Sequence, residues 1–307
     1  MEAIVVIVGF LGAGKTTLLK KLVDDALERE WNPFVVLNDY ENAHLDVDQL
    51  SDKLDTKWLK ALSGSCICCS GISELRNSVN RIPERKNGIT FIEANGTTDA
   101  CSLMGFLGVG IDNRFMPPIQ LSVIDVKNWQ KRGEHNELEA NQIQVSSLLV
   151  LTHEQNMDQA RISEVIAELK ALNPFAKIIK SSELDIACLP EVTPSENHAK
   201  ELAHHKAHWA SSSADLPELP DYLCVKELCE AIPSSILRVK GCTKVANEHH
   251  YTYFERCPDG EVYVRPYRGE PNTGSKLLTI GPGSSSQMLN ELIKNTLIDA
   301  KKRTTAL

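Results

Sequence analysis

One segment near the start of the chain restricts the possible folds more than any other. Residues 3–8 (AIVVIV) form a short β-branched run that ends at a glycine, which is typical of a buried parallel strand. Residues 9–16 (GFLGAGKT) complete the GxxxxGK[ST] phosphate-loop motif, and residues 16–30 carry leucines at helical spacing. A strand, this glycine-rich loop and a helix, in that order, are the context in which the motif binds nucleotide phosphates. The sequence therefore predicts a phosphate-binding α/β domain.

Segments with strand and helix patterns alternate after this loop. Further short apolar runs, which we expect to be strands, lie at 34–37, 89–93, 121–125, 148–151 and 178–180. Helical patterns occupy 74–81, 138–146 and 161–172. Strands that alternate with helices form a mainly parallel sheet with helices on both faces. We therefore predict the α/β fold of a P-loop NTPase domain, with a doubly wound sheet.

The pattern changes near residue 183, which predicts a domain boundary. Residues 186–222 contain several prolines and a short serine run, and we interpret them as a linker. Residues 223–307 combine helical segments with two alternating runs joined by Pro-Asp-Gly, a hairpin signal. A chain of 307 residues is long enough for two domains. We expect a nucleotide-binding domain at 1–185 and a smaller α+β C-terminal domain at 223–307.

Composition restricts the partners. The net charge of −8 disfavours non-specific nucleic-acid binding, which depends on phosphate neutralisation. The longest apolar run is too short to span a bilayer, and residues 1–15 lack the features of a signal peptide. We therefore expect a cytoplasmic protein without nucleic-acid or membrane partners, and leave homo-oligomer formation open.

The residue types in the loop predict its chemistry. Glycine N–H groups cradle phosphate oxygens, the Lys15 ammonium contacts the β- and γ-phosphates, and the Thr16 hydroxyl binds Mg²⁺. Glu93, at the end of the run 89–93, is placed to hold Mg²⁺ or its water, although an exposed strand-terminal acid is the alternative. The Gly96 N–H could contact the γ-phosphate. We predict catalytic roles for Lys15, Thr16 and Glu93, and phosphate contacts from the rest of the loop: Gly9, Gly12, Ala13, Gly14 and Thr17.

The residues that recognise the purine base of the nucleotide are expected directly after the run 148–151. Guanine-specific proteins of this fold usually carry Asn-Lys-x-Asp there, whereas this chain has Thr152, His153, Glu154 and Gln155. The aspartate of that motif accepts two hydrogen bonds from guanine, but the Gln155 amide has one acceptor and one donor. His153 could stack on a base, and Thr152 replaces part of what an asparagine does. The residues therefore leave the purine preference open between GTP and ATP.

Three of the nine cysteines form a cluster, Cys66-Ile67-Cys68-Cys69. In an extended segment Cys66 and Cys68 point the same way and could bind one metal ion, and Cys69 would join them where the chain turns. Two or three thiolates suit Zn²⁺, Co²⁺ or Cu⁺ and leave a coordination position open for transfer. A buried thiol group or a redox pair is the alternative. Four linker histidines offer metal binding or a solvated surface equally well: His198, His204, His205 and His208.

These motifs together resemble the CobW-type metallochaperone GTPases, relatives of UreG and HypB. The resemblance covers nearly the whole chain and rests on GFLGAGKTT at 9–17, SCICC at 65–69, EANGTTD at 93–99, LSVID at 121–125, LNPFAKIIKSS at 172–182 and ILRVKG at 236–241. It implies phosphate and Mg²⁺ roles for Gly12, Gly14, Lys15, Thr16 and Glu93, and metal binding by the CxCC cysteines. The chain departs from the family at 38–42, which reads NDYEN in place of NEFGE, and at Ser65, where the family usually has glycine. The Asn-Lys-x-Asp motif is absent at 152–155.

The resulting hypothesis is a slow nucleoside-triphosphate hydrolase that couples its nucleotide state to holding and releasing a transition metal, Zn²⁺ foremost, for an unidentified client protein. Unassisted GTPases turn over at roughly 10⁻⁴ to 10⁻² per second. A non-hydrolytic metal sensor or adaptor is the rival interpretation. A small-molecule kinase is a weaker one, because nothing in the second domain suggests an acceptor site.

Overall fold

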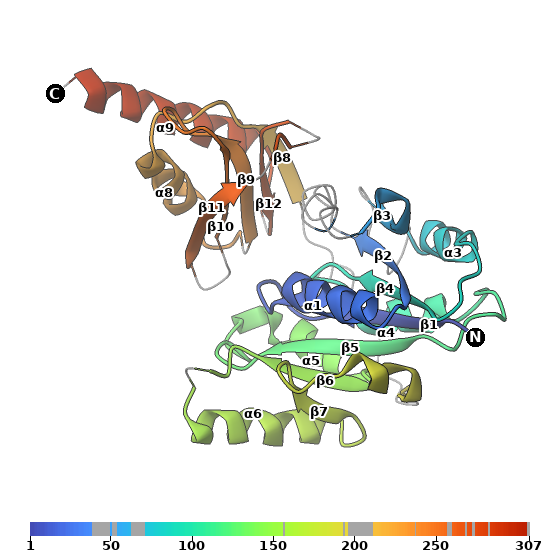
Figure 1. Ribbon diagram of the computed structural model, residues 1–307. Coiled ribbons are helices and arrows are strands. Elements are labelled where there is room, and N and C mark those ends of the chain that lie inside the picture. Colours follow the sequence, from blue (N-terminus) through green and yellow to red (C-terminus); the bar gives the residue numbers. More distant parts are fainter. Residues whose placement is uncertain are drawn as a thin grey trace. The chain divides into compact units, whose positions relative to one another are not determined.

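The computed structural model folds into two units, Met1–His208 and Trp209–Leu307. It describes residues 1–38, 50, 54–62, 71–155, 157–192, 194–195, 211–236, 238–256, 260–267, 269–271, 274–281 and 283–305. Each unit is built on its own sheet (Figure 1).

The sheet of the first unit has seven strands in the order β3-β2-β4-β1-β5-β6-β7, and every neighbouring pair is parallel. The strands are β1 (Ala3–Val8), β2 (Asn32–Asn38), β3 (Leu59–Leu62), β4 (Gly88–Glu93), β5 (Ile119–Asp125), β6 (Leu148–Thr152) and β7 (Lys177–Lys180). Because all strands run the same way, the loops that follow their carboxyl ends gather at one edge of the sheet. In such sheets, ligands bind at that edge.

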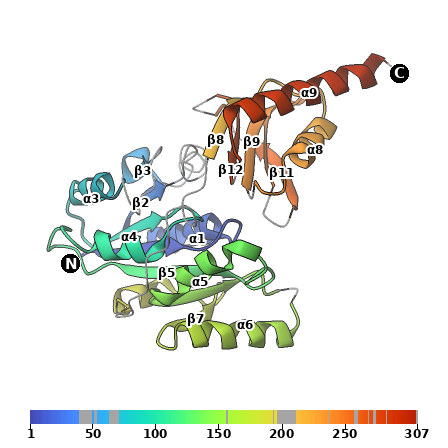
Figure 2. The same ribbon diagram turned by 180° about the vertical axis from the view of Figure 1, so that it is seen from behind.

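Helices cover both faces of this sheet, as the opposite views of Figures 1 and 2 show. Along β1, Val5 and Ile7 pack against α1, whereas Ile4 and Val6 pack against α3 and α4. This alternation follows from the two-residue period of a strand, and burial on both faces accounts for a run without polar residues. The helices are α1 (Lys15–Glu28), α3 (Ile72–Asn80), α4 (Ala100–Leu107), α5 (Asn136–Gln144) and α6 (Gln159–Leu172), with 3₁₀ turns at Thr56–Trp58, Gly133–His135 and Ile186–Glu191.

The second unit contains a five-stranded antiparallel sheet in the order β11-β10-β9-β12-β8. Two helices pack on it through a core that includes Leu228, Phe254 and Leu289. Its elements are β8 (Ser211–Asp215), α8 (Tyr222–Ala231), β9 (Arg238–Lys244), β10 (Tyr251–Arg256), β11 (Val262–Tyr267), β12 (Lys276–Ile280) and α9 (Ser286–Thr305).

The predicted fold class is confirmed: a parallel, doubly wound α/β domain is followed by a smaller α+β unit. Among the described strands and α-helices, β3, α4 and β8 have no counterpart in the sequence prediction. The segment α4 (ACSLMGFL) is almost uniformly apolar, so it lacks the amphipathic period that identifies a helix. The edge strand β8 (SSSAD) is polar, and its conformation comes from pairing with β12.

Both ends of the segment 186–222, expected to be a linker, belong to folded units. Ile186 and Leu189 pack in the core beneath α1, and β8 joins the second sheet. Within the described part of the chain, no helix is long and apolar enough to cross a membrane.

Candidate nucleotide site

The phosphate loop connects β1 to α1, as the sequence predicts, and its glycines have backbone conformations that other residues rarely adopt. Gly14 caps α1 with φ 92°, and Gly9 has φ 147°. A Cβ on Gly9 would lie 2.6 Å from the Val123 carbonyl oxygen, so only glycine fits between β1 and β5. The loop can therefore turn its N–H groups inward at the start of a helix, where the helix dipole also favours anions.

Lys15 lies inside this loop. Its Nζ donates to the carbonyl oxygen of Gly9 at 2.8 Å and to that of Phe10 at 3.2 Å, and the residue is 4% exposed. These bonds hold the ammonium group against the backbone of the phosphate loop. A buried cation in this position is suited to an anionic ligand such as a phosphate chain.

Thr16 and Glu93 meet beside the loop, as the sequence predicts. The Thr16 hydroxyl donates to Glu93 Oε1 at 2.8 Å, and Glu93 is 7% exposed at the end of β4. Strand pairing sets this contact, because β4 lies next to β1 with Glu93 opposite Ile7. One hydroxyl and one carboxylate leave room for waters and phosphate oxygens, which is the donor set that Mg²⁺ prefers. The residues therefore fit a magnesium ion, and Glu93 is not an exposed acid.

The loop after β4 packs against the phosphate loop. The Ala94 N–H donates to the Ile7 carbonyl at 2.9 Å. A Cβ on Gly96 would lie 2.8 Å from the Leu11 nitrogen and 2.5 Å from Leu11 Cδ2, so this contact requires glycine. Gly96 is thus brought beside the phosphate loop.

Thr152 and His153 adjoin the other side of the phosphate loop. The Thr152 hydroxyl lies 2.8 Å from the Ala13 carbonyl oxygen and 2.9 Å from that of Ile124, which ties the end of β6 to the loop. His153 has the left-handed φ of 57°, and a Cβ on Gly14 would lie 3.9 Å from its Nε2. Gln155 is exposed.

Asp125, at the end of β5, is a residue of this site that the sequence reasoning missed. One of its oxygens lies 3.0 Å from His153 Nδ1, and the other accepts from Asn128 Nδ2 at 2.9 Å and from Arg132 Nη2 at 3.0 Å. Burial alone would raise the pKa of Asp125, but the bonds from His153 and Asn128 and the nearby positive charges lower it to about 2. Asp125, like Glu93, stands at the end of an apolar run, and this pattern could have identified it from the sequence.

Arg132 extends this network to the phosphate loop and to α5. Its guanidinium carbon lies 4.9 Å from the centre of the Phe10 ring, within cation–π range. Its Nε lies 3.7 Å from Glu139 Oε1, and the Gln130 N–H donates to Glu139 Oε2 at 2.8 Å. Burial nevertheless raises the pKa of Glu139 to about 7, because these partners only partly offset the loss of water.

The CxCC cysteines and the linker histidines lie outside the described residues. In the chain, the cysteine segment follows β3, which ends at Leu62, and precedes α3, which begins at Ile72. Asn38, at the end of β2, donates to the Leu62 carbonyl at 3.3 Å. Since β3, β2, β4 and β1 are parallel, β3 ends at the same edge of the sheet as the strands that carry the phosphate loop and Glu93. In the ranges that the structure describes, no group of three His, Cys, Asp or Glu side chains could hold a metal ion.

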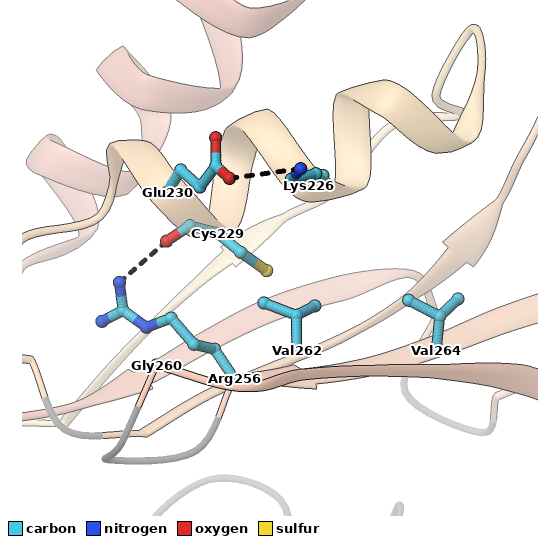
Figure 3. A pocket seen from close by; sticks show the side chains of 7 residues that line it. All are labelled: Lys226, Cys229, Glu230, Arg256, Gly260, Val262 and Val264. Carbon is cyan, nitrogen blue, oxygen red and sulfur yellow. Dashed lines mark hydrogen bonds and ion pairs between the residues drawn. The ribbon is translucent and has the colours of Figure 1, made fainter.

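A separate cavity of about 550 Å³ lies in the second unit, between α8 and the β10–β11 hairpin (Figure 3). Val262 and Val264 line it, and Arg256 donates to the Cys229 carbonyl at 2.7 Å. Burial raises the pKa of the Cys229 thiol to about 12, so it is not a thiolate at neutral pH and is a poor metal ligand. The described residues of the predicted site all belong to the first unit.

Comparison with known proteins finds relatives of this chain. The family profile described as "CobW/HypB/UreG, nucleotide-binding domain" matches residues 3–180. The zinc chaperone YjiA of Escherichia coli is 24% identical over 196 residues, which cover 61% of this chain and 60% of YjiA. The zinc chaperone CobW of Pseudomonas aeruginosa is 25% identical over 285 residues, 78% of this chain and 76% of that protein. The crystal structure of the Zn(II)-bound YjiA GTPase from E. coli aligns with a TM-score of 0.42 and 17% identity, covering 96% of this chain and 98% of that one. Because this family profile matches more than half of the chain, the chain belongs to the CobW/HypB/UreG family.

Proposed function

We propose that this chain is a slow GTPase-like nucleotide hydrolase whose nucleotide state controls the binding and transfer of a transition metal, with Zn²⁺ as the main cargo and Co²⁺ as the alternative. One observation carries the proposal. The strand β3, which precedes Cys66, Cys68 and Cys69 in the chain, ends at the sheet edge where Lys15 and the Thr16–Glu93 pair lie. The names of the relatives, among them the zinc-regulated GTPase metalloprotein activator 1 of Dictyostelium discoideum, support the same assignment.

Each group of site residues has a separate role in phosphate hydrolysis. The loop N–H groups and the Lys15 ammonium bind the β- and γ-phosphates and stabilise the charge that develops when water attacks the γ-phosphorus in line with the departing diphosphate. The Thr16 hydroxyl and the Glu93 carboxylate would hold magnesium, which neutralises the phosphate oxygens. The Gly96 N–H would contact the γ-phosphate. Gly9, Gly12, Ala13, Gly14 and Thr17 complete the cradle.

The purine base of the nucleotide would lie over Thr152 and His153. Asp125 is an anion at neutral pH, so it accepts a hydrogen bond from His153 Nδ1 and fixes the plane of the imidazole ring. A ring held in this way can stack on either purine. Gln155 supplies one acceptor, so we propose that GTP is bound with only a modest preference over ATP.

Thiolate ligands and nucleotide state are coupled through the loops at the common edge. The γ-phosphate would draw together the loop after β2 and the loop after β4. The cysteines, which lie between these two loops in the chain, would then come together and bind the metal. Hydrolysis then releases the metal to a client metalloprotein in the cytoplasm. The non-hydrolytic sensor remains the second candidate, because the segment 38–42 departs from the family pattern and the base-reading aspartate is replaced by Gln155.

The decisive experiment is a competition titration of Zn²⁺ against a chromophoric chelator. The protein is saturated either with a non-hydrolysable GTP analogue or with GDP. We expect zinc affinity to be higher with the triphosphate by a factor of about 5 to 150, and nucleotide affinity to rise by the same factor with zinc, because coupling is reciprocal. The double variant Cys66→Ser/Cys68→Ser should lose the coupling and keep nucleotide binding. Equal zinc affinity in the two nucleotide states would refute the chaperone function, and coupling without phosphate release would favour the sensor.

A further inference from the structure

The side chain of Gln142, on α5, reaches across to the loop that follows β4. Its Nε2 donates to the carbonyl oxygen of Gly96 at 3.2 Å and to that of Thr98 at 3.1 Å. Gln142 is 1% exposed, so these bonds are shielded from water. One amide group thus connects two backbone positions of the loop to a helix that is 44 residues further along the chain.

The position of Gln142 is itself fixed by β5. Its backbone carbonyl accepts hydrogen bonds from Gln120 Nε2 at 2.7 Å and from Ser122 Oγ at 2.9 Å. Ser146, one turn further along the chain, adds a third bond at 2.7 Å. All of these residues are buried. A central strand of the sheet therefore holds the amide in place, and the helix cannot shift without breaking this network.

The opposite side of the loop is held by the phosphate loop. Gly96 packs so closely on Leu11 that a Cβ would lie 2.8 Å from the Leu11 nitrogen. Within the loop, the Thr97 N–H donates to Asn95 Oδ1 at 3.1 Å. Gly96 is therefore confined between a nucleotide-binding loop on one side and the Gln142 amide on the other.

We propose that Gln142 is a positioning residue for the γ-phosphate response. By holding the Gly96 and Thr98 carbonyls toward α5, it keeps the Gly96 backbone beside the phosphate loop, where its N–H meets the γ-phosphate. Gln142 itself touches no phosphate. It acts on the preference for triphosphate over diphosphate, because only the triphosphate carries the group that this loop meets. The inference rests on the nucleotide site of the proposed function and does not depend on the metal.

A purely packing role would favour a different residue. Gln142 Oε1 is buried, and none of the described residues gives it a hydrogen-bond partner. An unsatisfied buried acceptor is destabilising, so an apolar side chain of equal length would pack at lower cost. The hydrogen bonds that Gln142 Nε2 donates to the Gly96 and Thr98 carbonyls explain why the side chain is polar.

The test compares Gln142→Met, which keeps the length and removes the donor, with Gln142→Asn, which keeps the amide but is one methylene too short to span both carbonyls. The matched control is Gln144→Met, two residues further along α5 and half-buried. The measurement is calorimetric binding of a non-hydrolysable GTP analogue and of GDP to metal-free protein containing Mg²⁺. We expect both Gln142 variants to weaken binding of the triphosphate about fivefold, as for the loss of the one hydrogen bond between the Gly96 N–H and the γ-phosphate. Binding of GDP should stay within about twofold of the wild type. Gln144→Met should leave both affinities unchanged.

GDP binding also reports that a variant is folded, and the Asn variant decides the question if the Met variant does not fold. An equal loss for GDP and the analogue, or no loss for either, would overturn the positioning role. Wild-type protein that binds nucleotide but shows no zinc coupling would refute the proposed chaperone function while leaving this result intact.

Discussion

The Thr16 hydroxyl donates a hydrogen bond of 2.8 Å to Glu93 Oε1, although 77 positions separate the two residues in the chain. Thr16 belongs to the first turn of α1 and Glu93 to the last position of β4. The pairing of β4 with β1 brings the acid to the end of the phosphate loop. The contact thus joins the residue that follows the loop lysine to the acid of the neighbouring strand, and both belong to the proposed nucleotide site.

Replacement of Lys15 by Ala should weaken nucleotide binding and any hydrolysis at least about tenfold, which corresponds to ~1.4 kcal/mol. The reason is that the backbone cradle remains while its central cation is removed. Binding is measured by calorimetry and turnover by phosphate release. The exposed Lys170→Ala on α6 is the control and should behave as the wild type. Unchanged affinity and turnover in Lys15→Ala would refute the assignment of the loop.

Glu93→Gln should reduce the dependence of nucleotide affinity on magnesium. The amide keeps the shape of the side chain and can accept from Thr16, but it loses the negative charge that attracts the cation. We expect the Mg²⁺ concentration at half-maximal nucleotide binding to rise about tenfold, an effect comparable to one charge-assisted contact. It is measured by titrating Mg²⁺ at fixed nucleotide concentration. An unchanged midpoint would remove Glu93 from the magnesium site.

Gln155→Asp should strengthen the preference for GTP over ATP. The carboxylate restores two acceptors for the guanine edge, where the amide of the wild type offers one acceptor and one donor. The ratio of the two dissociation constants should rise by about tenfold or more, since one hydrogen bond to a charged group contributes ~1.5 kcal/mol. Parallel titrations with non-hydrolysable analogues of GTP and ATP measure it. A strong preference in the wild type that this variant leaves unaffected would show that the base is read elsewhere.

Glu139 should make folding stability decrease with rising pH. Its pKa is raised to about 7 in the folded protein from an ordinary value near 4.5, so the folded state retains a proton that the unfolded state loses between these two values. The free energy of unfolding should therefore fall from about pH 4.5 to pH 7 and then level off. Glu139→Gln should remove this part of the pH dependence, measured by urea unfolding at several pH values. The exposed Glu137→Gln on the same helix is the control; equal pH profiles for wild type and Glu139→Gln would contradict the prediction.

Local sequence determined the parts of the site that lie within one segment. The strand at 3–8, the glycine loop and the helix that follows are specified by β-branched residues, by glycines with positive φ and by leucine spacing, all of which act over neighbouring positions. Glu93 could be assigned from its place after an apolar run, because parallel strands end at one edge. The metal-binding role of the CxCC cysteines stays a prediction, since these residues lie outside the described ranges.

Only the tertiary structure decided the contacts between distant segments. The link from Thr152 to Ala13, the pairing of His153 with Asp125 and the reach of Gln142 to Gly96 depend on how strands and helices pack, and no local pattern encodes them. The same holds for the polar strand β8, which is extended because β12 supplies its hydrogen-bond partners. The physical reason is common to these cases: hydrogen bonds between segments far apart in sequence form only after hydrophobic burial has brought the segments together, so the residues alone cannot identify their partners.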